Sequence, residues 1–332
     1  MSKTILITGG AGFIGSNFVR YMVNNYPDYT VYVVDTLTYA GNLDNISRDF
    51  FELPKFHFVE GTITDELLMR KLAAKADVVV HFAAESHVSY SIQNVSVFVE
   101  TNVKGTQVIC DAIKENGVER FINVSSSEVY GSALTVPMDE THPLLPYSPY
   151  AASKIGAERM VYAYYKTFNI PAVIIRPFNN YGSHQHIEKV IPRFITQALS
   201  GESLTVHDDG LQSRDWLFVG DTCIAIDKAM HGDIDTLKGE AINIGTGKDT
   251  NILKIAEMIL DYTGKPRDFI SIGDTRPGQV NQHLSSTEKA RDLLGWKAST
   301  EFSDGLARTV EWYRENQLWW QKLKKIELSH TM

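Results

Sequence analysis

Cysteine is scarce in this chain of 332 residues, in which only Cys110 and Cys223 occur. Each lies in an apolar, helix-like stretch, so we expect two buried free thiols in a reducing compartment rather than a disulfide or a metal site. No apolar run approaches the roughly 20 residues of a membrane span, and no signal-peptide pattern precedes the first strand-like stretch. We therefore expect a cytoplasmic protein with no membrane partner.

Basic runs are also absent, and the formal net charge is −8. This balance argues against a nucleic-acid or membrane-surface partner. His184 and His186 have no Cys, Asp or further His at ligand spacing, so no metal site is expected. Hydrophobic residues make up 43% of the chain and charged residues 22%, which is the composition of a globular protein with ample core.

Strand-like and helix-like patterns alternate through the first half. Strands are expected at 4–10, 31–35, 56–61, 77–84, 120–126 and 172–177, with helices that include 13–25, 97–117 and 148–168. This alternation predicts an α/β fold with a Rossmann-type doubly wound parallel sheet. Beyond Arg176 the pattern loosens, with short strands at 213–221 and 241–245. We expect a domain over 1–178, with return segments near 214–245, and a smaller α/β lobe over 179–332, separated by a cleft.

A glycine motif, GGAGFIG, lies between the first strand and the first helix. Gly9 suits the tight turn, Gly12 the approach of a pyrophosphate, and Gly15 the close packing of the helix, whose N-terminus attracts negative charge. Asp35 ends the second strand, where an acid accepts hydrogen bonds from ribose hydroxyls. No Arg or Lys follows at 36–42 to pair with a 2′-phosphate, so NAD is favoured over NADP.

A tyrosine and a lysine in YAASK, Tyr150 and Lys154, share one face of an expected helix. A neighbouring ammonium lowers the pKa of a phenol, which makes the tyrosine a usable base. The run SSSEVYG follows a strand, so Ser125, Ser126 and Glu128 should face the ligand crevice. These residues predict oxidation of an alcohol by NAD with Tyr150 as the base.

Nine motifs in order carry a family resemblance: TGGAGFIGSN, DTLTYAGN, FAAESHV, SSSEVYG, SPYAASK, RPFNNYG, IEKVIPR, SRDW and GWK. Over residues 3–318 the chain resembles extended short-chain dehydrogenases/reductases of the nucleotide-sugar 4,6-dehydratase type. It is similar to dTDP-glucose 4,6-dehydratases and to NDP-N-acetylglucosamine 4,6-dehydratases. The resemblance implies an NAD-binding first domain, a sugar-nucleotide-binding second lobe, and a homodimer formed through the helices at 97–114 and 148–168.

The resemblance also implies a reaction. Tyr150, assisted by Lys154, removes the C4 hydroxyl proton while C4 passes a hydride to NAD. Glu128 then removes the C5 proton, water leaves from C6, and the hydride returns to C6. The product is an NDP-4-keto-6-deoxy sugar, and Ser127 would supply or relay the C6 proton.

Further residues are assigned to the site by the same resemblance. Those expected around the cofactor, besides the glycines, Asp35, Tyr150 and Lys154, are Phe13, Ile14, Thr38, Gly41, Asn42, Thr62, Ile63, Ala83, Ala84 and Phe178. Those expected around the substrate are Ser86, Ser126, Asn179, Glu188, Lys189, Val190, Arg214 and Arg276.

Several positions depart from the dTDP-glucose pattern. Ser127 stands where that family has an Asp acid, and Ser126 where it has a Thr. Where that family has a diphosphate-binding Arg, this chain has Asn281 or Gln282. Ser89 and Tyr90 stand in place of the family's Asp-Arg pair, and Thr62 in place of its adenine-binding Asp. These departures leave the oxidation chemistry intact but leave the nucleotide and the sugar open.

Other functions share parts of this pattern. A UDP-sugar 4-epimerase uses Tyr150, Lys154 and NAD without needing Glu128. A 5,6-dehydratase or a C6 decarboxylase would keep Glu128, although neutral residues at 279–282 argue against binding a C6 carboxylate. A nucleotide-binding regulator on this fold would not need the intact set of Tyr150, Lys154 and Glu128.

Overall fold

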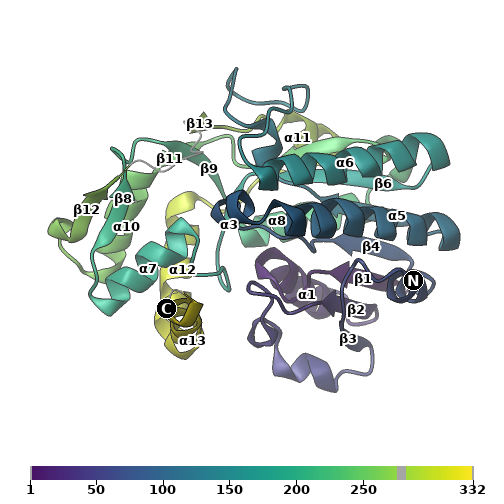
Figure 1. Ribbon diagram of the computed structural model, residues 1–332, viewed down its shortest axis with the longest axis horizontal. Helices are drawn as coiled ribbons and strands as arrows, with labels where there is room; N and C mark the ends of the chain where they lie inside the picture. Colours follow the sequence, from purple (N-terminus) through teal and green to yellow (C-terminus); the bar gives the residue numbers. More distant parts are fainter. Residues whose placement is uncertain (1, 275–281, 331–332) are drawn as a thin grey trace.

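A seven-stranded parallel sheet forms the centre of the larger part of the molecule (Figure 1). The computed structural model describes residues 2–274 and 282–330, with the side chains of the last helix described up to residue 324. In spatial order the strands are β10 (Ala241–Ile244), β6 (Ala172–Pro177), β5 (Arg120–Val124), β4 (Val78–His81), β1 (Thr4–Thr8), β2 (Thr30–Asp35) and β3 (Phe56–Glu60). All six strands expected in the first half form, and a seventh is added by the second half of the chain.

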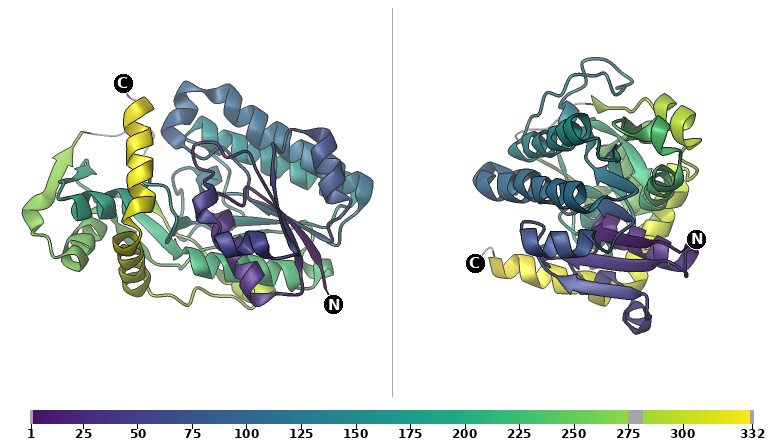
Figure 2. Two further views of the ribbon diagram at one scale, coloured as in Figure 1. Left: turned by 90° about the horizontal axis from the view of Figure 1, so that it is seen from below. Right: turned by 90° about the vertical axis from the view of Figure 1, so that its right-hand side faces the viewer.

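Helices cover both faces of this sheet (Figure 2), as the doubly wound prediction requires. One face packs against α1 (Phe13–Asn25), α8 (Val219–His231) and α11 (Glu288–Leu294). The other packs against α2 (Glu66–Ala73), α5 (Gly105–Asn116) and α6 (Pro149–Phe168). Neighbouring strand residues point to opposite faces, so Ile5 and Ile7 enter the first core and Leu6 the second. Cys223 and Cys110 lie one in each core, and both are buried free thiols as predicted.

The helix expected at 97–117 is not uniform. It consists of α4 (Val95–Phe98), a π-helical segment at Val99–Lys104 and α5, after the short helix α3 (Val88–Gln93). Within the π-helical segment the buried Asn102 accepts a hydrogen bond from the Glu85 amide at 2.8 Å and donates one to Ser153 Oγ at 2.8 Å. Asn102 thus ties the loop after β4 to α6 next to Tyr150, at the kind of site where π-helical turns often occur.

The smaller lobe has its own core and two small sheets. One contains β11 (Asp249–Asn251), β9 (Ser213–Phe218), β13 (Gln282–His283) and β7 (Asn179–Tyr181); the other pairs β12 (Ile270–Gly273) with β8 (Leu204–His207). Its helices are α7 (Val190–Ser200), α10 (Ile252–Thr263), α12 (Phe302–Glu315) and α13 (Gln317–His330). Short elements elsewhere are α9 (Ile234–Leu237) and the 3-10 helices at Leu43–Asn45, Arg48–Glu52, Ser127–Tyr130 and Arg267–Phe269.

The last helix, α13, reaches back from the smaller lobe toward the larger one (Figure 2). Trp319 donates its indole N–H to Oδ1 of Asn45 at 2.9 Å, and Lys322 pairs with Asp44 at 2.7 Å. Asn45 in turn donates to the carbonyl of Ala11 at 2.8 Å, inside the glycine motif. No helix in the described part of the chain is both long and apolar enough to cross a membrane.

Candidate active site

The glycine motif forms a tight loop between β1 and α1. Gly9 has φ +70°, and a Cβ there would lie 2.5 Å from the backbone nitrogen of Ala83. Only glycine fits a position that combines this φ with so close an approach. Among the described residues, none caps the first turn of α1 through its side chain, and that turn has no acidic residue. Its free N–H groups and helix dipole favour an anionic ligand such as a pyrophosphate.

Asp35 holds this loop from the end of β2. Its carboxylate accepts hydrogen bonds from the amides of Ala11 and Leu37, each at 2.9 Å. Burial raises the pKa of Asp35, while the backbone hydrogen bonds act in the opposite direction. The predicted cofactor residue Asn42 does not line the cavity between the two lobes. Its side chain caps the 3-10 helix at 43–45, and its backbone N–H donates to the carbonyl of Ala11. Asn42 therefore supports the loop from behind.

Helix α6 brings Tyr150 and Lys154 to the carboxyl ends of the sheet strands. Ser148 caps the helix by accepting from the Ala151 amide at 3.1 Å, and Pro149 follows at its first position, which is a strong helix start. Tyr150 therefore lies in the first turn and Lys154 in the next. The Lys154 ammonium donates to the carbonyl of Val124 at 2.8 Å, and Tyr150 shares a hydrogen bond with Ser126.

The acidities of these two groups differ from the expectation. Burial raises the pKa of Tyr150 to about 12, against the opposite effect of the Ser126 hydrogen bond. Burial also lowers the pKa of Lys154 to about 8, against the opposite effect of the Glu158 charge. The lower Tyr150 pKa expected from Lys154 is not found in the chain on its own, because desolvation of the phenol and the nearby Glu128 charge both raise this pKa.

The run after β5 supplies the remaining polar groups. Ser126 Oγ accepts from the Glu128 amide at 3.2 Å and so starts the 3-10 helix Ser127–Tyr130. Ser126, Ser127 and Glu128 all line the cavity beside Tyr150. Ser125 also reaches the wall, but its hydroxyl donates to Glu158 at 2.9 Å, so it is engaged by the protein.

The second lobe adds charged groups to the cavity wall. Glu188 lies 3.0 Å from Nε2 of His87 and 3.0 Å from Nζ of Lys189, and Lys189 donates to the carbonyl of Ser86 at 3.2 Å. Arg214 enters from β9; burial lowers the pKa of its guanidinium, and the negative charge of Glu128 acts against that effect. These residues therefore give the cavity wall charged groups of both signs.

Two further observations concern the predicted substrate residues. Oδ1 of Asn179, on the cavity wall, is buried and has no hydrogen-bond partner within the described residues, which suits contact with a polar ligand. Arg276 and Asn281 lie outside the described residues, so their predicted roles stay predictions. Gln282 donates to Asp249 at 2.7 Å.

One continuous cavity of about 710 Å³ joins these parts. It runs from the glycine loop past Tyr150 to Arg214 and, among the residues that the structure describes, is lined by every predicted site residue except Asn42. Sequence reasoning left other lining residues unassigned, among them the polar or charged residues Glu85, Gln185, Arg193, His207 and Gln212. Glu85 and Arg193 lie inside the motifs FAAESHV and IEKVIPR, which could have identified them. The other three enter through the packing of the second lobe.

The histidines that were considered for metal binding have packing and wall positions. His184 packs on Trp312 with ring centroids 4.4 Å apart and lies 3.3 Å from Nη2 of Arg20. His186 lines the cavity with its ring edge against Tyr39. His81 is a buried residue of β4, hydrogen-bonded to Thr8 and Thr106.

Comparison with known proteins agrees with this geometry. Residues 6–309 match the family described as GDP-mannose 4,6 dehydratase. The low-salt glycan biosynthesis protein Agl12 of Haloferax volcanii is 44% identical over 310 residues, which cover 93% of this chain and 98% of that protein. A dTDP-glucose 4,6-dehydratase of an Actinoplanes species is 42% identical over 321 residues, 95% and 99% of the two chains.

Solved structures are similar over the same length. The dTDP-glucose 4,6-dehydratase DesIV of Streptomyces venezuelae, solved with NAD and the ligand TYD bound, has a TM-score of 0.92 at 41% identity and covers 96% of this chain and 99% of its own. A UDP-glucose 4-epimerase of Thermotoga maritima, solved with UDP-glucose, has a TM-score of 0.88 at 30% identity and covers 95% and 99%. The chain belongs to the GDP-mannose 4,6 dehydratase family, as a dTDP-glucose 4,6-dehydratase-like member of the extended short-chain dehydrogenases/reductases.

Proposed function

We propose that the protein is an NAD-dependent nucleotide-sugar 4,6-dehydratase. It converts an NDP-hexose, of the glucose or N-acetylglucosamine type, to the NDP-4-keto-6-deoxy sugar. The observation that carries the proposal is that Glu128 lines the same cavity as Tyr150 and Lys154. A base for C5 beside a site for C4 oxidation is what 4,6-dehydration needs and what 4-epimerisation does not.

The glycine loop and Asp35 are the groups that would hold the cofactor. The uncapped N-terminus of α1 suits its pyrophosphate, and the Asp35 carboxylate suits the ribose hydroxyls of NAD. The absence of Arg and Lys at 36–42 favours NAD over NADP. When bound, NAD accepts the hydride from C4 and returns it to C6.

The chain's own residues manage the protons. In its phenolate form Tyr150 receives the proton of the C4 hydroxyl, with Ser126 as its hydrogen-bond partner and the Lys154 ammonium nearby. The resulting C4 ketone acidifies the C5 proton, which Glu128 removes. The C6 hydroxyl leaves as water with a proton that Ser127 supplies or relays, and Glu128 returns a proton to C5 after C6 has been reduced.

Groups of the second lobe would bind the nucleotide and the sugar. Arg214 suits a bidentate contact with a phosphate, and Asn179 has an oxygen without a partner among the described residues. Glu188, Lys189 and Val190 line the same cavity, together with Ser86 of the first domain. The replacement of the family's acid by Ser127 is the reason for including N-acetylglucosamine nucleotides beside glucose nucleotides.

A homodimer is part of this proposal. Exposed apolar side chains occur at the start of the first helix expected in the interface, at Val97 and Val99, and just before it, at Tyr90, Ile92 and Val95. Helices α5 and α6 lie side by side on that flank of the molecule (Figure 1). Light scattering at micromolar concentration tests the dimer, and a monomeric mass would contradict it.

Incubation with dTDP-glucose, UDP-glucose, UDP-N-acetylglucosamine and GDP-N-acetylglucosamine in separate reactions tests the activity. Loss of one water by mass together with a C6 methyl signal by proton NMR is the expected result. An unchanged mass with a changed C4 configuration would instead establish the 4-epimerase alternative, which the similarity to the Thermotoga enzyme keeps open. An exocyclic alkene would indicate a 5,6-dehydratase.

A further inference from the structure

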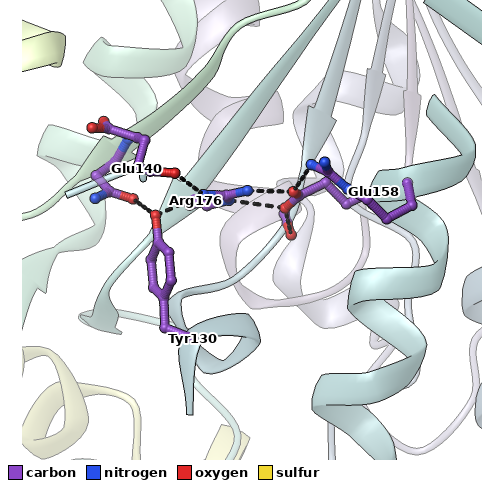
Figure 3. Close-up of polar contacts among 7 residues, drawn as sticks. Tyr130, Glu140, Glu158 and Arg176 are labelled. Carbon is purple, nitrogen blue, oxygen red and sulfur yellow. Dashed lines mark hydrogen bonds and ion pairs between the residues drawn. The ribbon is translucent and has the colours of Figure 1, made fainter. Parts of the chain in front are cut away.

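A buried ion pair lies behind the wall of the cavity without lining it. Glu158 of α6 is 0% exposed and Arg176 of β6 is 3% exposed. Nε of Arg176 donates to Oε2 of Glu158 at 3.0 Å, and Nη2 donates to Oε1, so the pair is bidentate (Figure 3). A buried pair costs desolvation and is weak evidence for stability by itself. The contacts of the pair therefore indicate its role better than its presence does.

Those contacts reach both ends of one segment, residues 125–130. At the near end, Ser125 donates its hydroxyl to Oε2 of Glu158 at 2.9 Å. At the far end, Nη1 of Arg176 donates to the hydroxyl of Tyr130 at 2.7 Å, with the guanidinium 5.0 Å from the centre of the Tyr130 ring. Ser126, Ser127 and Glu128 lie between these two attachments.

The far attachment is itself anchored to neighbouring elements. The Tyr130 hydroxyl donates to Oδ1 of Asn243 in β10 at 2.6 Å. The side-chain amide of Asn243 donates to the carbonyl of Met138 at 3.0 Å, and its backbone N–H donates to the Glu140 carboxylate at 2.7 Å. The Tyr130 ring is fully buried and does not line the cavity, so it cannot contact a ligand there. Its influence on the site must act through the backbone of the segment.

We propose that Glu158 and Arg176 are positioning residues that hold the two ends of the 125–130 segment, so that Ser126 meets Tyr150 and Glu128 faces the sugar. The inference rests on the proposed dehydratase function, because it concerns where the C5 base lies. A misplacement of about 1 Å at a reacting group can cost on the order of a hundredfold in rate. Fixing both ends of a short segment limits such movement.

The two attachments should affect different half-reactions. Ser125 is adjacent to Ser126, the hydrogen-bond partner of Tyr150, so the near end bears on oxidation at C4. Tyr130 is two residues from Glu128, so the far end bears on proton removal at C5. A role in overall stability alone would not separate the two steps.

The test uses Tyr130→Phe, which removes one hydroxyl and keeps the ring. Enzyme-bound NADH formation and solvent deuterium exchange at C5 are measured with an accepted nucleotide sugar, together with the melting temperature. We expect C5 exchange to fall roughly tenfold or more relative to NADH formation. Ser125→Ala should slow NADH formation first. Tyr21→Phe is the matched control, because it also removes a tyrosine hydroxyl that donates to a side chain, here Asp227 at 2.9 Å. Tyr21 does not line the cavity, so this variant should change neither rate.

Arg176→Lys gives a second measurement if Tyr130→Phe folds poorly. It keeps a positive charge for Glu158 but lacks the fork that also reaches Tyr130, so the same selective loss of C5 exchange is expected. An unchanged ratio of the two rates in both variants would overturn the inference. If the wild-type protein forms no NADH with any nucleotide sugar, the proposed function fails instead.

Discussion

The Lys154 ammonium donates a hydrogen bond to the carbonyl oxygen of Val124 at 2.8 Å, deep below the surface. This contact fixes the ammonium at the end of β5, but burial still lowers the pKa of Lys154 to about 8 from 10.5. The amine therefore loses its proton in the folded chain at a lower pH than in the unfolded chain.

This difference predicts a pH-dependent stability. Between about pH 8 and 10.5 the unfolded state binds more protons at Lys154, so the free energy of unfolding gains a contribution as the pH rises. Relative to Lys154→Met, the free energy of unfolding of the wild-type protein should rise by roughly 3 kcal/mol over that pH range. Chemical denaturation of both proteins at pH 7 and pH 10 measures it, and a constant difference between them would contradict the assigned burial of the charge.

Asp35 should determine both cofactor affinity and cofactor choice. Asp35→Asn keeps the shape of the side chain and removes its charge, and charge-assisted hydrogen bonds contribute about 1.5–3 kcal/mol. We expect NAD binding to weaken by roughly ten- to a hundredfold and the preference over NADP to shrink. Fluorescence titration of cofactor-free protein measures both, with the exposed Asp49→Asn as the control. Release of NADP on denaturing the purified wild-type protein would show the assignment to be wrong.

Alanine substitutions at Gly9 and Gly117 distinguish the effect of steric contact from the effect of backbone strain. Both have positive φ, near +70°, but a Cβ at Gly9 would lie 2.5 Å from the Ala83 nitrogen, whereas at Gly117 nothing lies within 4 Å. Gly117→Ala should therefore cost only the backbone strain, about 1–3 kcal/mol of stability, of a φ, ψ of 71° and 141° that L residues rarely adopt. Gly9→Ala should cost more and abolish retention of the cofactor, as judged by melting temperature and by absorbance of the purified protein. Equal losses would mean that the contact with Ala83 is unimportant.

Ser127 should help elimination without being indispensable. It is buried beside Glu128 on the cavity wall, where water can replace a relaying hydroxyl. Ser127→Ala should slow product formation by less than roughly tenfold, below the usual contribution of a general acid or base. Ser127→Asp should raise turnover of a glucose nucleotide by restoring an acid at this position. A Ser127→Ala enzyme as slow as one without Glu128 would make Ser127 an essential proton donor.

Local patterns predicted much of this structure. The six strands of the first half, the glycine loop and the Tyr150 helix form as expected, because β-branched runs, glycine spacing and the Ser148-Pro149 helix start are encoded over a few residues. The addition of β10 beside β6 depends on contacts between distant segments. No periodicity in the chain predicts such pairings.

The site shows the same division. Motif spacing identified Tyr150, Lys154 and Glu128, which the structure brings to one cavity. The raised pKa of Tyr150 could not be read from the sequence, because it depends on how completely the phenol is desolvated. The Glu158–Arg176 pair was also missed, because its partners come from α6 and β6 and carry no shared motif.

The central claim is that Glu128 is the C5 base of a dehydratase, and Glu128→Gln tests it most directly. Oxidation at C4 needs Tyr150 and Lys154, so this variant should still form enzyme-bound NADH, while Tyr150→Phe should form none. The measurement is deuterium incorporation at C5 from heavy water, followed together with NADH absorbance. The account predicts NADH without measurable C5 exchange in Glu128→Gln. Deuterium entering C5 at the wild-type rate would remove Glu128 from the mechanism and favour a 4-epimerase.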